Sequence, residues 1–179
     1  MPSKITYNGI FLNSHIVVTE DLDAAKSELN SKSGFGTSEE KRLILSLVEG
    51  LYLLEKERLS IFDSKSNEID YNSFVKKAGK LDKNFLVKYY VYRDMRTRGY
   101  LIKTALKYGA DFRVYDRGAK PGDEHAKWIL YAVSEHDSYS WKSFVGLNRV
   151  AHSVRKRLLV GIVDSEGDVT YYEISWQKP

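Results

Sequence analysis

The stretch RLLVGIVDSEGDVTYYEISW, Arg157 to Trp176, decides the fold of the second half of the chain. Two runs rich in β-branched and aromatic residues flank the tetrapeptide SEGD at residues 165–168. Strand-forming runs joined by a short turn with a glycine at its bend are typical of a β-hairpin. We therefore expect two antiparallel strands at this end of the chain.

Helices and further strands are expected upstream of this hairpin. Apolar residues recur at helical spacing from Tyr139 to Arg155, and again from Phe85 to Arg98, where Gly99 supplies the stop signal of a helix end. Short strand-like runs lie between the two helices, at Tyr100–Thr104, Asp111–Asp116 and His125–Val133. Residues 85–179 are therefore predicted to form a mixed β-sheet flanked by helices.

The first half has its own pattern of strands and helices. The runs ITYNGIFLN and HIVVT predict an N-terminal hairpin, and short helices are expected at Glu20–Leu29 and Tyr71–Lys80. Between these helices, Thr37 and Glu40 have the spacing of a capping box. They precede a row of leucines at helical spacing, Leu43, Leu47, Leu51 and Leu54. We expect one long core helix there, in a mixed α/β domain.

A polar junction around Leu81 to Asn84 marks the boundary between two small domains, residues 1–84 and 85–179. The first domain carries 12 Lys and Arg against 13 Asp and Glu, and the second carries 16 against 11. Clustered Lys and Arg gain free energy by releasing counterions from phosphates, so the second domain suits a polyanionic partner. A solvated basic face that keeps the protein soluble explains the same charge equally well.

Composition excludes several classes of protein. The 179 residues are 42% hydrophobic, enough for a core, and include no cysteine, which excludes disulfides, thiolate zinc sites and thiol redox chemistry. The longest apolar runs, such as LLVGIV at 158–163, are far shorter than the ~20 residues of a membrane span. The N-terminus MPSKITYNG lacks the apolar region of a signal peptide. We expect a cytoplasmic protein with no membrane partner.

Metal-dependent nuclease chemistry has little support in the second domain. Such sites need converging carboxylates to hold Mg²⁺. The acids of this domain fall mostly in predicted turns, among them Asp116, Asp123, Glu124, Asp164 and Asp168. The four histidines, at positions 15, 125, 136 and 152, include no pair at the spacing of helical ligands. We expect no metal ion and no other cofactor.

RNA can be cleaved without a metal because its own 2′-hydroxyl can attack the adjacent phosphorus. The enzyme must take a proton from that hydroxyl, neutralise charge on the phosphorane and give a proton to the departing 5′-oxygen. Tyr115, Lys156 and His125 are candidates for these tasks. Each also has an ordinary structural interpretation, as a core aromatic, a charge at a helix C-terminus and a strand-edge residue respectively.

Two blocks of the second domain resemble the signature blocks of the archaeal tRNA-splicing endonucleases. They are YRDMRTRGYLIKTALKYGADFRVYDRG, followed by His125, and RVAHSVRKRLLVGIVDSEGDVTYYEISW. In the first domain, LILSLVEGLYLLEKERLSI resembles the N-terminal core helix of this family and the strand after it. The resemblance covers essentially the whole chain. It implies two small domains, the second with a restriction-endonuclease-like fold.

The resemblance implies an activity and a set of catalytic residues. Family members cleave precursor tRNA at bulge-helix-bulge intron boundaries without a metal, leaving a 2′,3′-cyclic phosphate and a 5′-hydroxyl. The matching positions make Tyr115 the general base, His125 the general acid and Lys156 the stabiliser of the phosphorane. An ordinary tyrosine hydroxyl, with a pKa of ~10, is mostly protonated at neutral pH. Such a base needs nearby cations, or else it only orients the 2′-hydroxyl.

The resemblance also implies residues for RNA binding and assembly. Arg149 and Trp176 match the pair that pinches a flipped-out bulge base, although some members have a second arginine in place of the tryptophan. His152, one helical turn after Arg149, is expected to be structural. Members of this length are homotetramers in which an acidic loop of one dimer enters a basic cleft of the other. The acids of the hairpin turn match that loop: Asp164, Glu166 and Asp168.

Two alternative functions stay open. One is a non-catalytic RNA-binding or structural subunit of such an endonuclease, although Tyr115, His125 and Lys156 are all present. The other is a metal-free ribonuclease on the same fold that cuts another structured RNA. Incubation with an intron-containing precursor tRNA in EDTA distinguishes all three functions.

Overall fold

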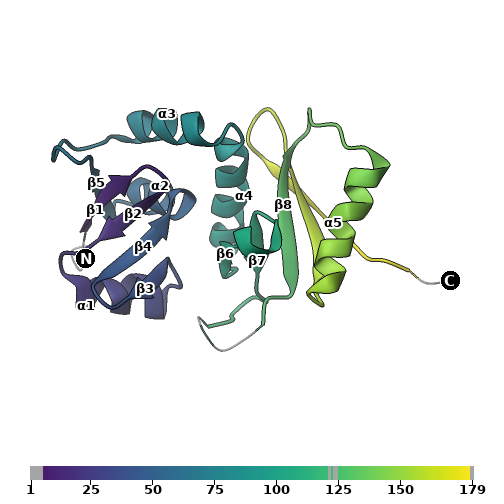
Figure 1. Ribbon diagram of the computed structural model, residues 1–179, viewed down its shortest axis with the longest axis horizontal. Helices are drawn as coiled ribbons and strands as arrows, with labels where there is room; N and C mark the ends of the chain where they lie inside the picture. The colour runs from purple at the N-terminus through teal and green to yellow at the C-terminus, as the bar shows by residue number, and fades with distance from the viewer. Residues whose placement is uncertain (1–5, 121, 123–124, 178–179) are drawn as a thin grey trace. The chain divides into compact units, whose positions relative to one another are not determined.

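The computed structural model describes residues 6–120, 122 and 125–177 of the chain. The chain forms two compact units, Met1–Tyr89 and Tyr90–Pro179, and each contains one five-stranded sheet (Figure 1). The division falls within helix α4 (Phe85–Thr97). The expected organisation, two mixed α/β domains, is confirmed. No helix among the described residues is both long and apolar enough to cross a membrane.

The first unit has a mixed sheet in the order β3-β4-β2-β1-β5. β1 (Tyr7–Leu12) and β2 (His15–Val18) form the predicted N-terminal hairpin, and β5 (Leu59–Phe62) joins β1 in parallel. The helical segments are α1 (Leu22–Ala25), the π-helix η1 (Lys26–Lys32), α2 (Leu47–Glu55) and α3 (Tyr71–Leu81). Both short helices predicted from the sequence are therefore present, and the first continues as a π-helix.

The prediction of a long helix that begins at Thr37 is wrong. β3 (Thr37–Glu39) and β4 (Arg42–Ser46) form an antiparallel hairpin there, and α2 begins only at Leu47. Leu43 and Leu45 are fully buried and alternate with more exposed neighbours, which is the period of a strand.

A different pair of residues forms the capping box of α2. The Ser46 side chain accepts a hydrogen bond from the backbone N–H of Glu49, and the Glu49 carboxylate accepts one from the Ser46 N–H at 2.8 Å. The second carboxylate oxygen of Glu49 accepts a hydrogen bond from the Gly36 N–H, also at 2.8 Å. The spacing of Thr37 and Glu40 imitates this motif without forming it.

The second unit has the sheet order β10-β9-β8-β7-β6. The strands are β6 (Ile102–Thr104), β7 (Phe112–Val114), β8 (Trp128–Ser134), β9 (Arg157–Val163) and β10 (Val169–Ile174), and the 3₁₀ turn η2 (Leu106–Tyr108) lies between β6 and β7. Neighbouring strands are antiparallel except β8 and β9, which are parallel and connected through α5 (Trp141–Ser153). The hairpin, the mixed sheet and the flanking helices predicted for this half are all confirmed.

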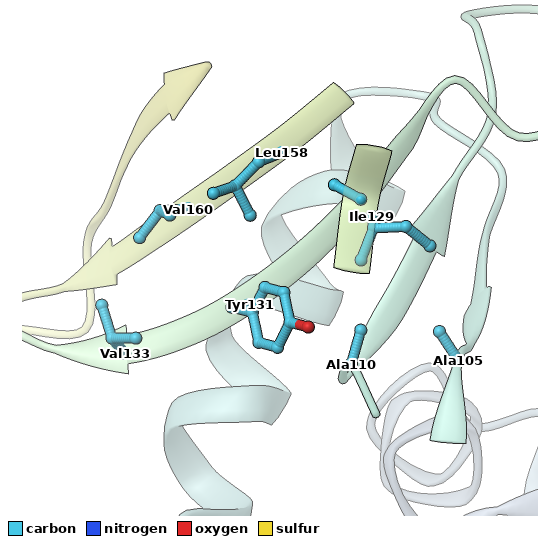
Figure 2. Close-up of a cluster of buried hydrophobic side chains, with 8 residues drawn as sticks. Ala105, Ala110, Ile129, Tyr131, Val133, Leu158 and Val160 are labelled. Carbon is cyan, nitrogen blue, oxygen red and sulfur yellow. The ribbon is translucent and has the colours of Figure 1, made fainter. Parts of the chain in front are cut away.

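The two faces of the second sheet are covered by different helices. Figure 2 shows Tyr131 of β8 and Leu158 of β9 in one buried cluster, against which Leu147 of α5 packs. On the other face, Tyr92 of α4 packs on Phe112 of β7 with ring centroids 5.8 Å apart. Helices α4 and α5 therefore enclose the sheet from opposite sides (Figure 1).

Candidate active site

The strand order of the second sheet brings the three predicted catalytic residues to one end of the sheet. Lys156 directly precedes β9, and His125 lies shortly before β8. Because β8 and β9 are parallel, both segments enter the sheet at the same end. Tyr115 directly follows β7, which is antiparallel to β8, so the chain leaves β7 at that end too. Three segments far apart in the sequence therefore meet.

Contacts with Ala126 join these three segments. The Lys156 ammonium donates a hydrogen bond to the Ala126 carbonyl oxygen at 2.7 Å. Tyr115, which is only 8% exposed, shares a small buried cluster with Ala126 and Leu101. His125 immediately precedes Ala126, and its side chain is exposed. The site therefore has a buried tyrosine, a half-buried lysine and a solvent-accessible histidine around one alanine.

The end of α5 fixes the backbone of Lys156. Arg155 has a left-handed conformation with φ of 55°, and its N–H donates to the His152 carbonyl at 3.0 Å. The Lys156 N–H donates to the Ala151 carbonyl at 2.9 Å. These two bonds form a Schellman motif, which ends the helix and directs the chain into β9. Lys156 is thus both a charge at a helix C-terminus and a member of the site.

Arg113 is a further cation next to Tyr115. Its guanidinium carbon lies 6.0 Å from the centroid of the Tyr115 ring. The two residues are two apart along β7 and its extension, so they share a face. The buried Nε of Arg113 has no hydrogen-bond partner in the part of the chain that the structure describes. Arg113 was not predicted to act beside the tyrosine, although the two-residue period of a strand could have indicated that the two side chains share a face.

A hollow of about 370 Å³ beside α5 contains both predicted base-binding residues. Its lining comprises Val145, Asn148, Arg149, His152, Ser153 and Trp176. Trp176 is 62% exposed, and its ring meets the His152 ring edge-on with centroids 5.5 Å apart. The structure therefore brings Arg149 and Trp176 together, and His152, predicted to be structural, lies in the same hollow.

The three acids of the turn between β9 and β10 differ in their contacts. Asp164 Oδ1 accepts hydrogen bonds from the backbone N–H groups of Glu166, at 3.0 Å, and Asp168, at 2.9 Å. Gly167, with φ of 86°, completes the turn in a conformation that favours glycine. The side chains of Glu166 and Asp168 are exposed. Asp164, which is also exposed, therefore maintains the loop through its hydrogen bonds, whereas for the other two acids no such bond of the carboxylate is seen among the described residues.

Residues of three strands, none of them predicted to belong to the site, form a hydrogen-bonded group. Glu173 of β10 accepts a hydrogen bond from the Trp128 indole at 2.6 Å and one from the Arg157 guanidinium at 2.8 Å. These bonds, that of Trp128 most of all, hold the pKa of the Glu173 carboxyl below its ordinary value. Trp128 and Glu173 are 45 residues apart in sequence, so no local pattern indicates their contact.

A metal site is not evident in the described ranges 6–120, 122 and 125–177. No three His, Asp or Glu residues in these ranges lie close enough together to share a metal ion. Asp123 and Glu124, two of the acids named from the sequence, lie outside the described residues. Metal independence stays a prediction for experiment to test.

Two protein-family models match the chain. The model for the catalytic C-terminal domain of tRNA intron endonucleases matches residues 85–171, and the model for the N-terminal domain of tRNA intron endonucleases matches residues 9–75. The chain belongs to the tRNA intron endonuclease family. The catalytic-domain match includes Tyr115, His125 and Lys156, and it ends before Trp176.

Individual members of the tRNA intron endonuclease family are similar over three quarters or more of this chain. The tRNA-splicing endonuclease of Pyrococcus furiosus is 40% identical over 161 residues, 90% of this chain and 92% of that protein. That of Methanothermobacter thermautotrophicus is 40% identical over 163 residues, 91% and 94% of the two chains. That of Nanoarchaeum equitans is 43% identical over 141 residues, which are 75% of this chain and 90% of that protein. The family predicted from the signature blocks is confirmed.

Proposed function

We propose that this chain excises introns from precursor tRNA by cutting bulge-helix-bulge sites without a metal ion, as a tRNA-intron lyase. Membership of the family makes the chain an endoribonuclease of tRNA splicing. The observation that best supports the proposed chemistry is the meeting of Tyr115, His125 and Lys156 around Ala126. We place this activity in the cytoplasm, since a reducing compartment suits a chain with no cysteine.

The proposed reaction is an internal attack by RNA on its own backbone. Tyr115 takes the proton of the 2′-hydroxyl, and the 2′-oxygen attacks the adjacent phosphorus. The P–O2′ bond forms as the P–O5′ bond breaks, and His125 gives its proton to the departing 5′-oxygen. The products therefore end in a 2′,3′-cyclic phosphate and a 5′-hydroxyl. The exposed position of the His125 side chain suits contact with an RNA phosphate.

Lys156 stabilises the negative charge of the phosphorane in this proposal. A lysine ammonium has three N–H donors, and one of them is bonded to the Ala126 carbonyl at 2.7 Å. Among the described residues no other partner of this ammonium is seen, so two donors are left for phosphorane oxygens. The bond to a backbone carbonyl also restricts a long side chain before substrate arrives, and charge that is already in place lowers the barrier most effectively.

Incubating the purified chain with an intron-containing precursor tRNA in EDTA tests this function against its two rivals. We expect cleavage at both bulges. Binding without cleavage would support a non-catalytic subunit, and cleavage away from the bulges would support a ribonuclease for another structured RNA. Cleavage that requires added Mg²⁺ would contradict the metal-free chemistry.

We propose that Arg149 and Trp176 hold a flipped-out base of the bulge. A guanidinium and an indole can stack on any base, which suits recognition by RNA shape instead of sequence. Their position in one hollow, with Trp176 largely exposed, supports this role over packing in a core. The His152 ring supports the indole at its edge.

Changing Arg149 and Trp176 together to alanine is expected to weaken cleavage at bulged sites about 10-fold or more. Stacking on an aromatic side chain contributes ~1–3 kcal/mol per base. The melting temperature should stay near that of the native chain. Trp141→Ala is the matched control, because Trp141 is also on the surface, 81% exposed, at the start of α5. A large drop in melting temperature for Trp176→Ala alone would show that Trp176 packs in a core.

We propose that the chain acts as a homotetramer. A bulge-helix-bulge has two cut sites, whereas one chain carries one set of Tyr115, His125 and Lys156. The exposed carboxylates of Glu166 and Asp168 suit docking into a basic surface of another copy, since the second domain has an excess of Lys and Arg. Asp164 supports this docking indirectly, because its carboxylate holds the loop in shape.

Changing Glu166 and Asp168 together to lysine is expected to convert the tetramer into a dimer and to impair cutting at the second site. The change reverses the charge of the loop and leaves Asp164, with its two hydrogen bonds, in place. Light scattering measures the molar mass of the assembly and therefore the number of subunits in it. Glu40→Lys with Glu57→Lys, two exposed acids of the first unit, is the control for net charge. A tetramer that persists in the loop variant would exclude this loop, and a native monomer would exclude the assembly.

A further inference from the structure

Glu173 lies next to the first residues of the two strands that follow His125 and Lys156. Trp128 begins β8 and Arg157 begins β9, and these two residues are direct neighbours in the parallel pair. Glu173 of β10 pairs with Leu159, two residues further along β9. Because alternate residues of a strand share a face, the side chains of Trp128, Arg157 and Glu173 lie on the same face of the sheet.

The Glu173 carboxylate connects the two strand starts directly. Its Oε2 accepts from Trp128 Nε1 at 2.6 Å, and its Oε1 accepts from an Arg157 guanidinium nitrogen at 2.8 Å. The distance from the indole is short for an N–H donor, the distance from the guanidinium is ordinary for a charged pair, and hydrogen bonds to an ionised acceptor are about twice as strong as neutral ones. A single side chain therefore bridges β8 and β9 where each strand begins.

The Trp128 ring is held by its other neighbours as well. The Tyr100 ring meets it edge-on with centroids 6.2 Å apart, and the Lys127 ammonium lies 4.4 Å from its centroid. Lys127 also forms an ion pair with Asp116 at 3.0 Å. An indole with these contacts has few alternative positions. The hydrogen bond to Glu173 therefore restrains the backbone of β8, because the indole cannot move independently of its strand.

The strand starts are in turn bonded to the catalytic segments. Arg157 N–H donates to the Lys127 carbonyl at 3.0 Å, and the Lys156 ammonium donates to the Ala126 carbonyl at 2.7 Å. Lys156 directly precedes Arg157, and His125 directly precedes Ala126. A shift between the starts of β8 and β9 therefore moves the Lys156 ammonium relative to His125.

We propose that Glu173 is a positioning residue that holds Lys156 in register with the His125 segment through Trp128 and Arg157. The proposal rests on the catalytic roles proposed above for His125 and Lys156. As a partly exposed ion pair, Glu173 and Arg157 should contribute little to the stability of the fold. A displacement of about 1 Å at a catalytic group, in contrast, can cost ~100-fold in rate. The effect of Glu173 on the cleavage rate can therefore be separated from its effect on the stability of the fold.

Glu173→Ala is expected to slow single-turnover cleavage of precursor tRNA about 10- to 100-fold. Affinity for uncleaved precursor tRNA, melting temperature and oligomeric state should stay near native. Glu173→Gln keeps an oxygen acceptor for Trp128 and should recover part of the rate. Glu39→Ala is the matched control, because Glu39 is an exposed acid paired with Arg42 at 2.6 Å in the other unit, and its loss changes the net charge equally.

A double-mutant cycle with Lys156→Ala tests the route of the effect. If Glu173 acts by placing Lys156, Glu173→Ala should add far less loss in the Lys156→Ala chain than in the native chain. Losses that multiply independently would overturn the proposal, as would a changed oligomeric state or a changed affinity for uncleaved RNA in Glu173→Ala. A native rate for Glu173→Ala with an inactive His125→Ala would refute the positioning role alone. Native rates for both variants would also overturn the catalytic role proposed for His125, and absence of precursor-tRNA cleavage by the native chain would overturn the proposed function itself.

Discussion

His125→Ala is expected to slow single-turnover cleavage of precursor tRNA by ~10²–10⁴-fold, the usual contribution of general acid catalysis. Without the imidazole, the 5′-oxygen must depart without a proton. Binding of the precursor should persist, because the exposed His125 side chain does not support the buried clusters of the second unit. Rates measured with enzyme in excess over RNA separate the bond-breaking step from product release.

His136→Ala is the control for this experiment. His136 is also exposed, but it lies in the turn after β8. Its ring Nε2 is 3.7 Å from the Oε1 atom of Glu135. Its removal should leave the cleavage rate near native. An unchanged rate in His125→Ala, measured with the same RNA, would show that the general acid is assigned to the wrong residue.

Lys156→Ala is expected to lose rate to a similar degree, because the phosphorane would lose a preorganised positive charge. Lys156→Arg should restore the rate only in part. A planar guanidinium is a broader group than an ammonium and does not place its charge at the same point beside the Ala126 carbonyl. Single-turnover rates, together with affinity for uncleaved RNA, separate this loss from weaker binding.

Lys142→Ala controls for the loss of one positive charge from the second unit. Lys142 is exposed in the first turn of α5, the helix whose other end leads to Lys156. We expect little change in its cleavage rate. Equal losses for Lys142→Ala and Lys156→Ala would mean that Lys156 contributes general attraction for RNA and not a specific contact with the reacting phosphate.

The second domain could be predicted well from its sequence because local patterns and tertiary packing agree there. Gly99 ends α4 as expected, and the glycine turn at 165–168 joins two strands whose burial follows their apolar residues. The first domain was harder to predict at Thr37–Ser46. Leucines spaced four residues apart fit the period of a helix, whereas Leu43 and Leu45, two residues apart, fit the period of a strand. Pairing with β2 decides between the two patterns, and this partner is distant in sequence.

The catalytic candidates could be named from the sequence, but their proximity could not be derived from spacing. Tyr115 and Lys156 are brought near Ala126 by the order of β7, β8 and β9 in the sheet. Family signature blocks indicated which residues to consider, and the topology explains how they meet. Glu173 was missed because a carboxylate on a strand carries no local signature, and its partners come from two other strands.

The chemistry of the cut ends tests the central claim, metal-free attack by the 2′-hydroxyl, most directly. The purified chain is incubated in EDTA with a precursor tRNA, and the ends of the intron and exons are identified by mass spectrometry. We predict a 2′,3′-cyclic phosphate on one side of each cut and a 5′-hydroxyl on the other, at both bulges. Ends that carry a 3′-hydroxyl and a 5′-phosphate would contradict the account, because a water molecule and not the RNA would then have attacked the phosphorus.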